Sequence, residues 1–383
     1  MTLASKRKPS PASPASIDVA RARLANQRLT GERFAAPEDV VRWLGAVQAQ
    51  DYAGAKWAVA QRTAGCGDAD VERACAEGRI LRTHVLRPTW HFVLPDDIRW
   101  MLALTAPRVR AAMATYDRQL GLDDAVFRRS QTVLARTLAG GKAYTREELA
   151  GKLAAAGIEA SGPRLGQVMM RAEVDALITS GPPRGKQRTY ALLDERAPRG
   201  RTLGREEALA ELAGRYFTSH GPAQPGDFAW WSGLTVGDAR RGIEAARPRL
   251  ASAVVDGKTF WFAPGVGRAR ARSGRSVVHL LPNYDELVVA YRDHGPSLAP
   301  GVAGKLKARP EVVASHVVVV DGRVVGGWRR LEAKGAMTVE TMVVSRLDAG
   351  ARAALRAGAA RFQSFLGMPV KLRARPGGRM RAS

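Results

Sequence analysis

Before residue 265, the same succession of hydrophobic patterns, first helical and then strand-like, occurs three times along the chain. Apolar residues first recur every three or four positions, which is typical of helices, and then alternate with polar ones over short runs, which is typical of strands. In the first unit, Val40, Val41, Leu44 and Val47 form a helical stripe behind Pro37, a residue favoured in a first helical turn. The ranges predicted for this unit are helices over 37–47, 56–61 and 70–77, and strands over 80–86 and 89–94.

The second and third units follow the same order. The predicted helices of the second unit, after a long connecting helix over 95–119, cover 124–138, 145–156 and 163–179. A basic tip over 181–188 then leads to a short strand over 189–193. The ranges predicted for the third unit are helices over 206–219 and 236–246, and strands over 251–255 and 259–263. An Asp256-Gly257 turn between β-forming residues favours a hairpin there.

The strands of the first unit are predicted to pair as a hairpin about Arg87-Pro88. A symmetric pairing about that turn sets Leu86 opposite Thr89, Val85 opposite Trp90 and His84 opposite His91. One face would then carry Leu81, Thr83, Val85, Trp90, Phe92 and Leu94. The other would carry Arg82, His84, Thr89 and His91. We interpret this hairpin as a wing with one face on a core and one face available for binding.

Beyond residue 265 the composition changes to short β-rich runs. The predicted strands cover 277–281, 287–291, 315–321, 324–328, 337–344 and 369–372, with a helix over 348–366. The fold class predicted for the whole chain is α+β, with three tandem winged-helix units followed by a small antiparallel β-barrel-like domain. The predicted divisions are a disordered basic tail over 1–16, winged helices over 17–122, 123–204 and 205–265, a basic linker over 266–276, a β-rich domain over 277–372 and a basic tail over 373–383.

Charge points to a polyanionic partner. Sixty Lys and Arg residues against 36 Asp and Glu give a net charge of +24, a field that attracts double-stranded DNA and releases its counterions. A solvated, arginine-rich surface set by codon usage is the alternative. No apolar run is long enough for a membrane span. We expect a monomer in the cytoplasm that is nucleoid-associated when bound to DNA. Cys66 and Cys75 match no metal-ligand spacing, and neither a metal nor another cofactor is expected.

The candidate catalytic residues are Gln48, Gln50 and Asp51, which lie where the first helical stripe ends. An amide oxygen is a poor proton acceptor, so the glutamines suit the positioning of water and not strong base catalysis. Residues i and i+2 lie about 200° apart on a regular helix. The two amides therefore converge only if the helix breaks between Val47 and Ala53. Asp51 fits either a catalytic carboxylate or a helix cap.

Five segments of the chain resemble the AlkZ-like family of bacterial winged-helix DNA glycosylases. The segments are 48–52, 55–58, 86–92, 280–286 and 291–293, together with shorter matches at 99–100 and 106–109. The resemblance implies tandem winged helices and a β-barrel domain around a concave DNA cradle. It also implies monofunctional excision of alkylated bases by a Gln-x-Gln motif, which Gln48 and Gln50 match. Alone, this short motif would equally describe a surface pair that hydrogen bonds backbone at a helix end.

Weak assistance by amides favours a leaving group that is already activated. A cationic N7- or N3-alkylated purine departs as a neutral base, so we expect hydrolysis of its glycosidic bond in duplex DNA, with bulky adducts or interstrand crosslinks as further substrates. Uncharged lesions such as uracil are not expected to be substrates. The alternatives are a non-enzymatic winged-helix DNA-binding or regulatory protein, and a protein-binding scaffold whose charge is incidental.

The predicted DNA contacts lie on the two hairpins and beside the motif. They are Lys56, Arg82, His84, Arg87, Thr89, His91, Arg184, Lys186 and Arg188. His84 and His91 have three interpretations, which are phosphate contact, orientation of the nucleotide, and a cross-strand pair. Trp57, Trp90 and Phe92 are expected in the core.

Overall fold

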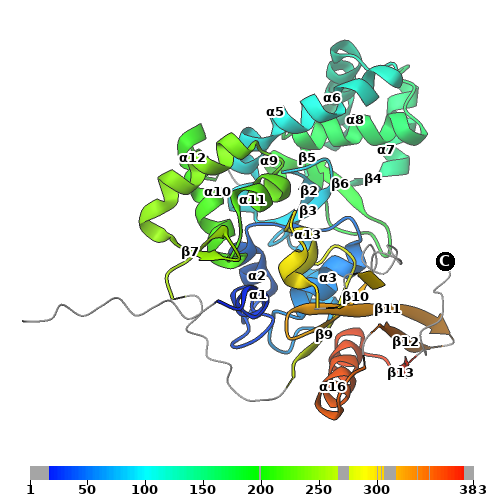
Figure 1. Cartoon of the computed structure of the whole chain (residues 1–383). Coiled ribbons are helices and arrows are strands. Elements are labelled where there is room, and N and C mark those ends of the chain that lie inside the picture. The colour runs from blue at the N-terminus through cyan, green and yellow to red at the C-terminus, as the bar shows by residue number, and fades with distance from the viewer. Residues whose placement is uncertain are drawn as a thin grey trace, which may run out of the picture.

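The structure, a computed structural model, consists of two helix-rich groups and a curved sheet around the segment that begins with the helix Val19–Asn26 (Figure 1). It describes residues 17–197, 200–265, 276–299, 301–302, 304–305, 316–333, 335–344 and 346–374. The predicted N-terminal tail and nearly all of the predicted linker and C-terminal tail lie outside these ranges. No helix in the described ranges is long and apolar enough to cross a membrane.

The first unit combines short helices with a three-stranded sheet in the order β1-β3-β2. Its elements are α1 (Val19–Asn26), α2 (Pro37–Leu44), β1 (Val47–Gln48), α3 (Tyr52–Ala60), α4 (Asp68–Ala76), β2 (Leu81–His84), β3 (Trp90–Val93) and α5 (Pro95–Gln119). The long helix has the predicted bounds. The prediction that Val47 continues the helical stripe is wrong, because Gly45 adopts a positive φ of 82° and ends α2.

The second and third units each contain helices and a hairpin. The second has α6 (Asp124–Leu138), β4 (Tyr144–Thr145), α7 (Arg146–Ala155), α8 (Gly162–Val174), β5 (Ile178–Ser180), β6 (Thr189–Leu192) and α9 (Leu193–Arg196). The third has α10 (Arg205–Ser219), α11 (Pro225–Ser232), α12 (Val236–Ala246), β7 (Ala251–Val255) and β8 (Lys258–Phe262). The helix predicted over 163–179 is too long, because Ala176 has a φ of 60° and the chain then forms β5.

The C-terminal part is a five-stranded sheet in the order β13-β12-β11-β10-β9. Its elements are β9 (Val278–Leu281), α13 (Glu286–Val289), β10 (Val317–Val320), β11 (Arg323–Ala333), β12 (Ala336–Val343), α16 (Ala349–Leu366) and β13 (Val370–Ala374). The strands β9 and β13 are the two edges of this sheet, and helix α16 contacts both of them. The sheet therefore curves around α16 like half of a barrel. Two predictions are wrong here. The β12–β13 pair is parallel because α16 connects the two strands, and most of the strand predicted over 287–291 is α13, capped by Asp285.

The first unit and the C-terminal sheet share one hydrophobic core. The Trp57 ring lies 5.0 Å from the rings of both Phe362 and Phe365 on α16, and its indole N–H donates to the carbonyl of Leu280 on β9. The second unit has a separate apolar cluster of its own. Trp57 and Phe92 are buried, as predicted. The predicted division of the chain into domains stays a prediction. The core described here contains residues of both the predicted first winged helix, 17–122, and the predicted β-rich domain, 277–372.

Candidate active site and nucleic-acid interface

The glutamine motif lies in a break between two helices, as predicted. After α2 ends, Val47 and Gln48 form β1, and α3 begins at Tyr52. The Asp51 carboxylate accepts a hydrogen bond from the Gly54 N–H at 3.1 Å and caps α3. The structure therefore gives Asp51 the helix-capping role that the sequence left open, and its catalytic role stays a prediction.

Gln48 is buried and held at two points by charged residues. Its backbone N–H donates to Glu286 Oε1 at 2.7 Å, and its side-chain Oε1 accepts from Arg87 Nη2 at 2.6 Å. Backbone pairing with His91 fixes the same residue on the sheet. One of the two acceptor positions of the amide oxygen is therefore occupied, while the amide nitrogen has no hydrogen-bond partner among the described residues and is the donor that Gln48 can offer to a substrate.

Gln50 is exposed and lines a cavity between the first two units. Its Oε1 lies 3.4 Å from the backbone nitrogen of Trp90, which donates to it. The intervening Ala49 is fully buried, and its N–H donates to the Trp90 carbonyl at 2.7 Å. Within the described part of the chain, no hydrogen bond joins the two glutamine side chains. They share instead the β2–β3 hairpin as their support.

Glu286 is a buried carboxylate behind Gln48. Besides the Gln48 N–H, it accepts from Trp231 Nε1 at 2.9 Å and is 3.3 Å from His220 Nε2. Burial opposes its ionisation, yet hydrogen bonds, that from His220 above all, hold the pKa of Glu286 below its usual value. Glu286 lies in the segment 280–286, which resembles the AlkZ-like family, but no role was predicted for it. Its partners come from distant parts of the chain.

The predicted register of the first hairpin is wrong by one residue. His84 pairs with Trp90 and Thr83 with His91, because the loop contains five residues, 85–89, and not a two-residue turn. Leu86 in this loop has a φ of 65°, and its carbonyl oxygen approaches the backbone of Gly233, where a Cβ atom would clash. A shift of one residue changes which side chains share a face.

The shift changes the surroundings of both hairpin histidines. His91 is fully buried beneath the sheet, its Nδ1 lies 3.0 Å from the Thr89 carbonyl oxygen, and burial together with Arg87 lowers its pKa to about 3. His84 Nδ1 lies 2.5 Å from Glu173 Oε2, and its ring is 4.2 Å from that of Trp90. The predicted His84–His91 pair does not form, and Trp90 lines the cavity instead of packing in the core.

Acidification is expected to destabilise the fold through His91 and His279. Burial is the main cause that lowers the pKa of each to about 3, so between pH 6.5 and 3 the unfolded chain binds more protons than the folded one. Stability is therefore lost as the pH falls below 6.5, by about 2 kcal/mol per histidine between pH 7 and 5. Urea unfolding at both pH values measures the loss, and a His279→Gln variant should lose less. An identical loss in that variant would contradict the assignment.

The predicted DNA contacts fall into two groups. Four residues are engaged within the protein: Lys56 binds Asp68 and Glu72 at 2.8 and 2.7 Å, Arg87 binds Gln48, His84 binds Glu173, and His91 is buried. For these, phosphate contact would first require loss of internal bonds. Those that face solvent or the cavity are Arg82, Arg184, Lys186 and Arg188.

Two of the predicted contacts are less open than the sequence suggested. Arg184 is exposed but forms an ion pair with Glu148 at 2.7 Å. The Thr89 hydroxyl is buried and, among the described residues, has no hydrogen-bond partner. The roles of Arg184 and Thr89 in DNA contact stay predictions.

Comparisons with known proteins agree with the resemblance drawn from the sequence. The family model described as "DNA glycosylase AlkZ-like" matches residues 41–365. A curated relative, "Interstrand DNA cross-link repair glycosylase" of Streptomyces sahachiroi, is 26% identical over an alignment of 339 residues, and the match covers 82% of this chain and 88% of the relative. The solved structure of "Streptomyces sahachiroi DNA glycosylase AlkZ" has a similar fold, with a TM-score of 0.76 at 24% identity over 94% of this chain and 98% of that one. The chain belongs to the AlkZ-like family of DNA glycosylases, which are hydrolases of N-glycosyl bonds.

Proposed function

We propose that this protein excises cationic alkylated purines, with N7 or N3 adducts, from duplex DNA by hydrolysing the N-glycosidic bond. The observation that carries the proposal is Gln48, a neutral amide held between the Arg87 guanidinium and the Glu286 carboxylate in a strongly basic protein. The name of the Streptomyces relative supports bulky adducts and crosslinks as further substrates. The three units with hairpins are proposed to be the winged helices of a DNA cradle.

The charged groups around the motif leave little capacity for strong base catalysis. Glu286 is buried and already accepts several hydrogen bonds, while Asp51 caps a helix. Gln48 offers its amide nitrogen as a donor, and Gln50, at the cavity, is placed to orient a water molecule. A substrate whose base departs as a neutral molecule needs no more than such positioning and hydrogen bonding.

Single-turnover excision tests the proposed activity. We expect the protein to release 7-methylguanine from a duplex with one such lesion, and to leave a matched duplex with uracil intact. Comparable release of uracil would overturn the cationic selectivity. Binding of both duplexes without release of either base would instead favour the alternative, a non-enzymatic DNA-binding protein.

Arg87 is expected to affect the reaction through Gln48 and not through phosphate. In an Arg87→Met variant the Gln48 oxygen loses its charged partner, so the single-turnover rate should fall by about 10- to 100-fold, as a misplaced catalytic group does. The slope of log affinity against log salt should not change, because no phosphate contact is lost. Added guanidinium ions should restore part of the rate. A flatter salt slope with an unchanged rate would assign Arg87 to DNA phosphate.

A further inference from the structure

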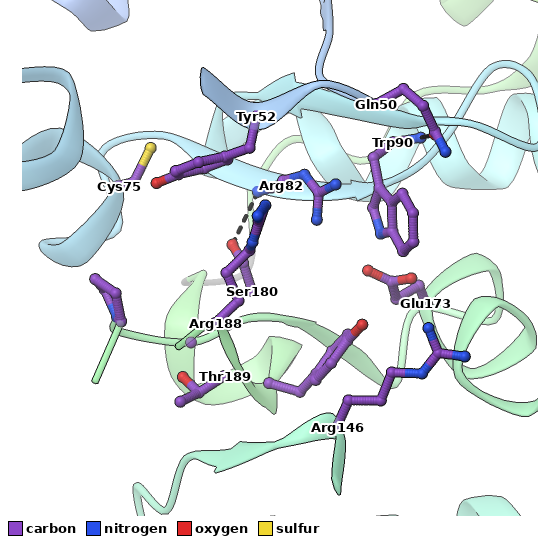
Figure 2. Close-up of a pocket in the computed structure, with 13 residues that line it drawn as sticks. Gln50, Tyr52, Cys75, Arg82, Trp90, Arg146, Glu173, Ser180, Arg188 and Thr189 are labelled. Atoms are coloured by element: carbon purple, nitrogen blue, oxygen red, sulfur yellow. Dashed lines mark hydrogen bonds between the residues drawn. The ribbon is translucent and has the colours of Figure 1, made fainter. Parts of the chain in front are cut away.

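A cavity of about 340 Å³ lies between the β2–β3 hairpin of the first unit and the β5–β6 hairpin of the second. Figure 2 shows side chains of both units pointing into it. The lining residues that matter here are Gln50, Tyr52, Arg82, Trp90, Glu173 and Arg188. The exposed Gln50 places this cavity beside the catalytic motif.

Arg82 is anchored along one edge and open along the other. Its backbone N–H donates to Ser180 Oγ at 2.9 Å, and its Nε donates to the Ala49 carbonyl at 3.0 Å. The guanidinium carbon lies 4.3 Å from the centre of the Trp90 ring. Among the described residues, the two Nη atoms have no hydrogen-bond partner, so they are available to a ligand in the cavity.

Arg188 comes from the opposite hairpin and has no carboxylate partner in the described part of the chain. Its guanidinium carbon lies 4.6 Å from the centre of the Tyr52 ring. The Arg82 guanidinium carbon lies 5.9 Å from the centre of the same ring, so Tyr52 contacts both cations. Burial and then repulsion by Arg188 lower the pKa of Arg82 to about 10. The carboxylate that lines the cavity, Glu173, is bound to His84 and forms no ion pair with either arginine.

The aromatic walls do not favour a stacked nucleobase as the occupant. The ring of Trp90 already packs against both His84 and Arg82, and that of Tyr52 contacts Arg188 and Phe92. Three guanidinium groups line the cavity, those of Arg82, Arg146 and Arg188, against one carboxylate, Glu173, so the excess of positive charge instead favours an anion with several oxygen acceptors. A phosphodiester has that chemistry, and duplex DNA is the polyanion that the net charge attracts.

We propose that Arg82 and Arg188 clamp one DNA phosphodiester in this cavity, next to Gln50. The proposal rests on the proposed function, because it places the strand that carries the lesion. It implies that the first two units hold the same phosphate and thereby fix the register of the strand relative to the catalytic motif. The remaining phosphate contacts would then add affinity without setting this register.

A scan with neutral phosphates tests the clamp. The duplex carries one 7-methylguanine on a 2′-fluorinated sugar, which resists glycosidic hydrolysis, and a single methylphosphonate placed at successive positions of the lesion strand. For the wild-type protein we expect one position at which affinity falls by about tenfold, the effect of one charge-assisted hydrogen bond or more. Arg188 is exposed, so Arg188→Met should fold normally. In this variant the methylphosphonate at that position should lower the affinity by no more than about twofold.

Two further variants complete the test. Arg82→Lys keeps the charge but loses the two-pronged donor, and should show a reduced fall at the same position. Arg129→Met, on the exposed face of α6 and not among the cavity residues, should reproduce the wild-type scan. A full tenfold fall in Arg188→Met, or no sensitive position in the wild type, would overturn the clamp. The scan measures binding to DNA that cannot be hydrolysed. A failure of the protein to release 7-methylguanine in the excision assay would therefore refute the proposed activity without changing the result of the scan.

Discussion

Replacing Gln48 with alanine is expected to lower the single-turnover rate of 7-methylguanine release by about 100- to 1000-fold, the usual effect of removing one fixed hydrogen-bond donor from an active site. The backbone N–H would still bind Glu286, so the sheet and the loop should persist. The loss would thus come from the side chain alone. Rate measurements with protein in excess over DNA, alongside binding measurements, separate this effect from weaker affinity.

Two variants make that result specific. Gln48→Glu keeps the shape of the side chain and an oxygen for Arg87 but lacks the amide N–H, so it should be as slow as the alanine variant. Gln119→Ala, at the exposed end of α5, should retain the wild-type rate. If Gln48→Glu remained fully active, the oxygen and not the nitrogen of Gln48 would be the group that matters.

The largest expected loss of stability follows from removing the Asp285 carboxylate. Arg62 is 1% exposed, and its Nη1 and Nη2 atoms each donate to an oxygen of Asp285 at 2.9 Å. Asp285→Ala leaves this guanidinium without a counter-charge in the interior, which costs about 3–5 kcal/mol of unfolding free energy. The same substitution removes the cap of α13. Denaturant unfolding of wild type and variant gives the difference.

A double variant and a surface pair provide the comparison. Arg62→Met combined with Asp285→Ala removes both charges, so it should be more stable than Asp285→Ala alone. Glu244→Ala breaks an ion pair with Arg247 whose side chains are more than half exposed, and should change stability by about 0.5 kcal/mol or less. Equal losses in the double and single variants would show that a cost other than the buried charge dominates.

Local sequence signals predicted the helices better than the pairing of strands. The predicted ranges of α5 and α6 match the structure, in which Pro95 begins α5 and the Asp123 carboxylate caps α6, and both residues act within one turn of the helix. The hairpin register depended on a loop that Leu86 closes against Gly233, a contact between segments far apart in the chain. The run over 287–291 is too short for its hydrophobicity to distinguish a strand from a helix.

The candidate site was predictable in part. The amides of Gln48 and Gln50 and the break around them followed from the motif and from helix geometry. The role of Arg87 beside Gln48, and the burial of Glu286, depend on tertiary packing of the third unit and the C-terminal part against the hairpin. Charge alone could not reveal which arginines are engaged inside the protein and which face solvent or the cavity.

The contact between Trp57 and the two phenylalanines of α16 has a consequence for biosynthesis. Helix α3 leaves the ribosome early, while the residues that cover its apolar side are translated near the other end of the described chain. The apolar side of α3 therefore stays exposed for most of elongation, and it can associate with other chains during that time. Nascent-chain intermediates should accordingly engage chaperones until α16 has emerged, however stable the finished enzyme is.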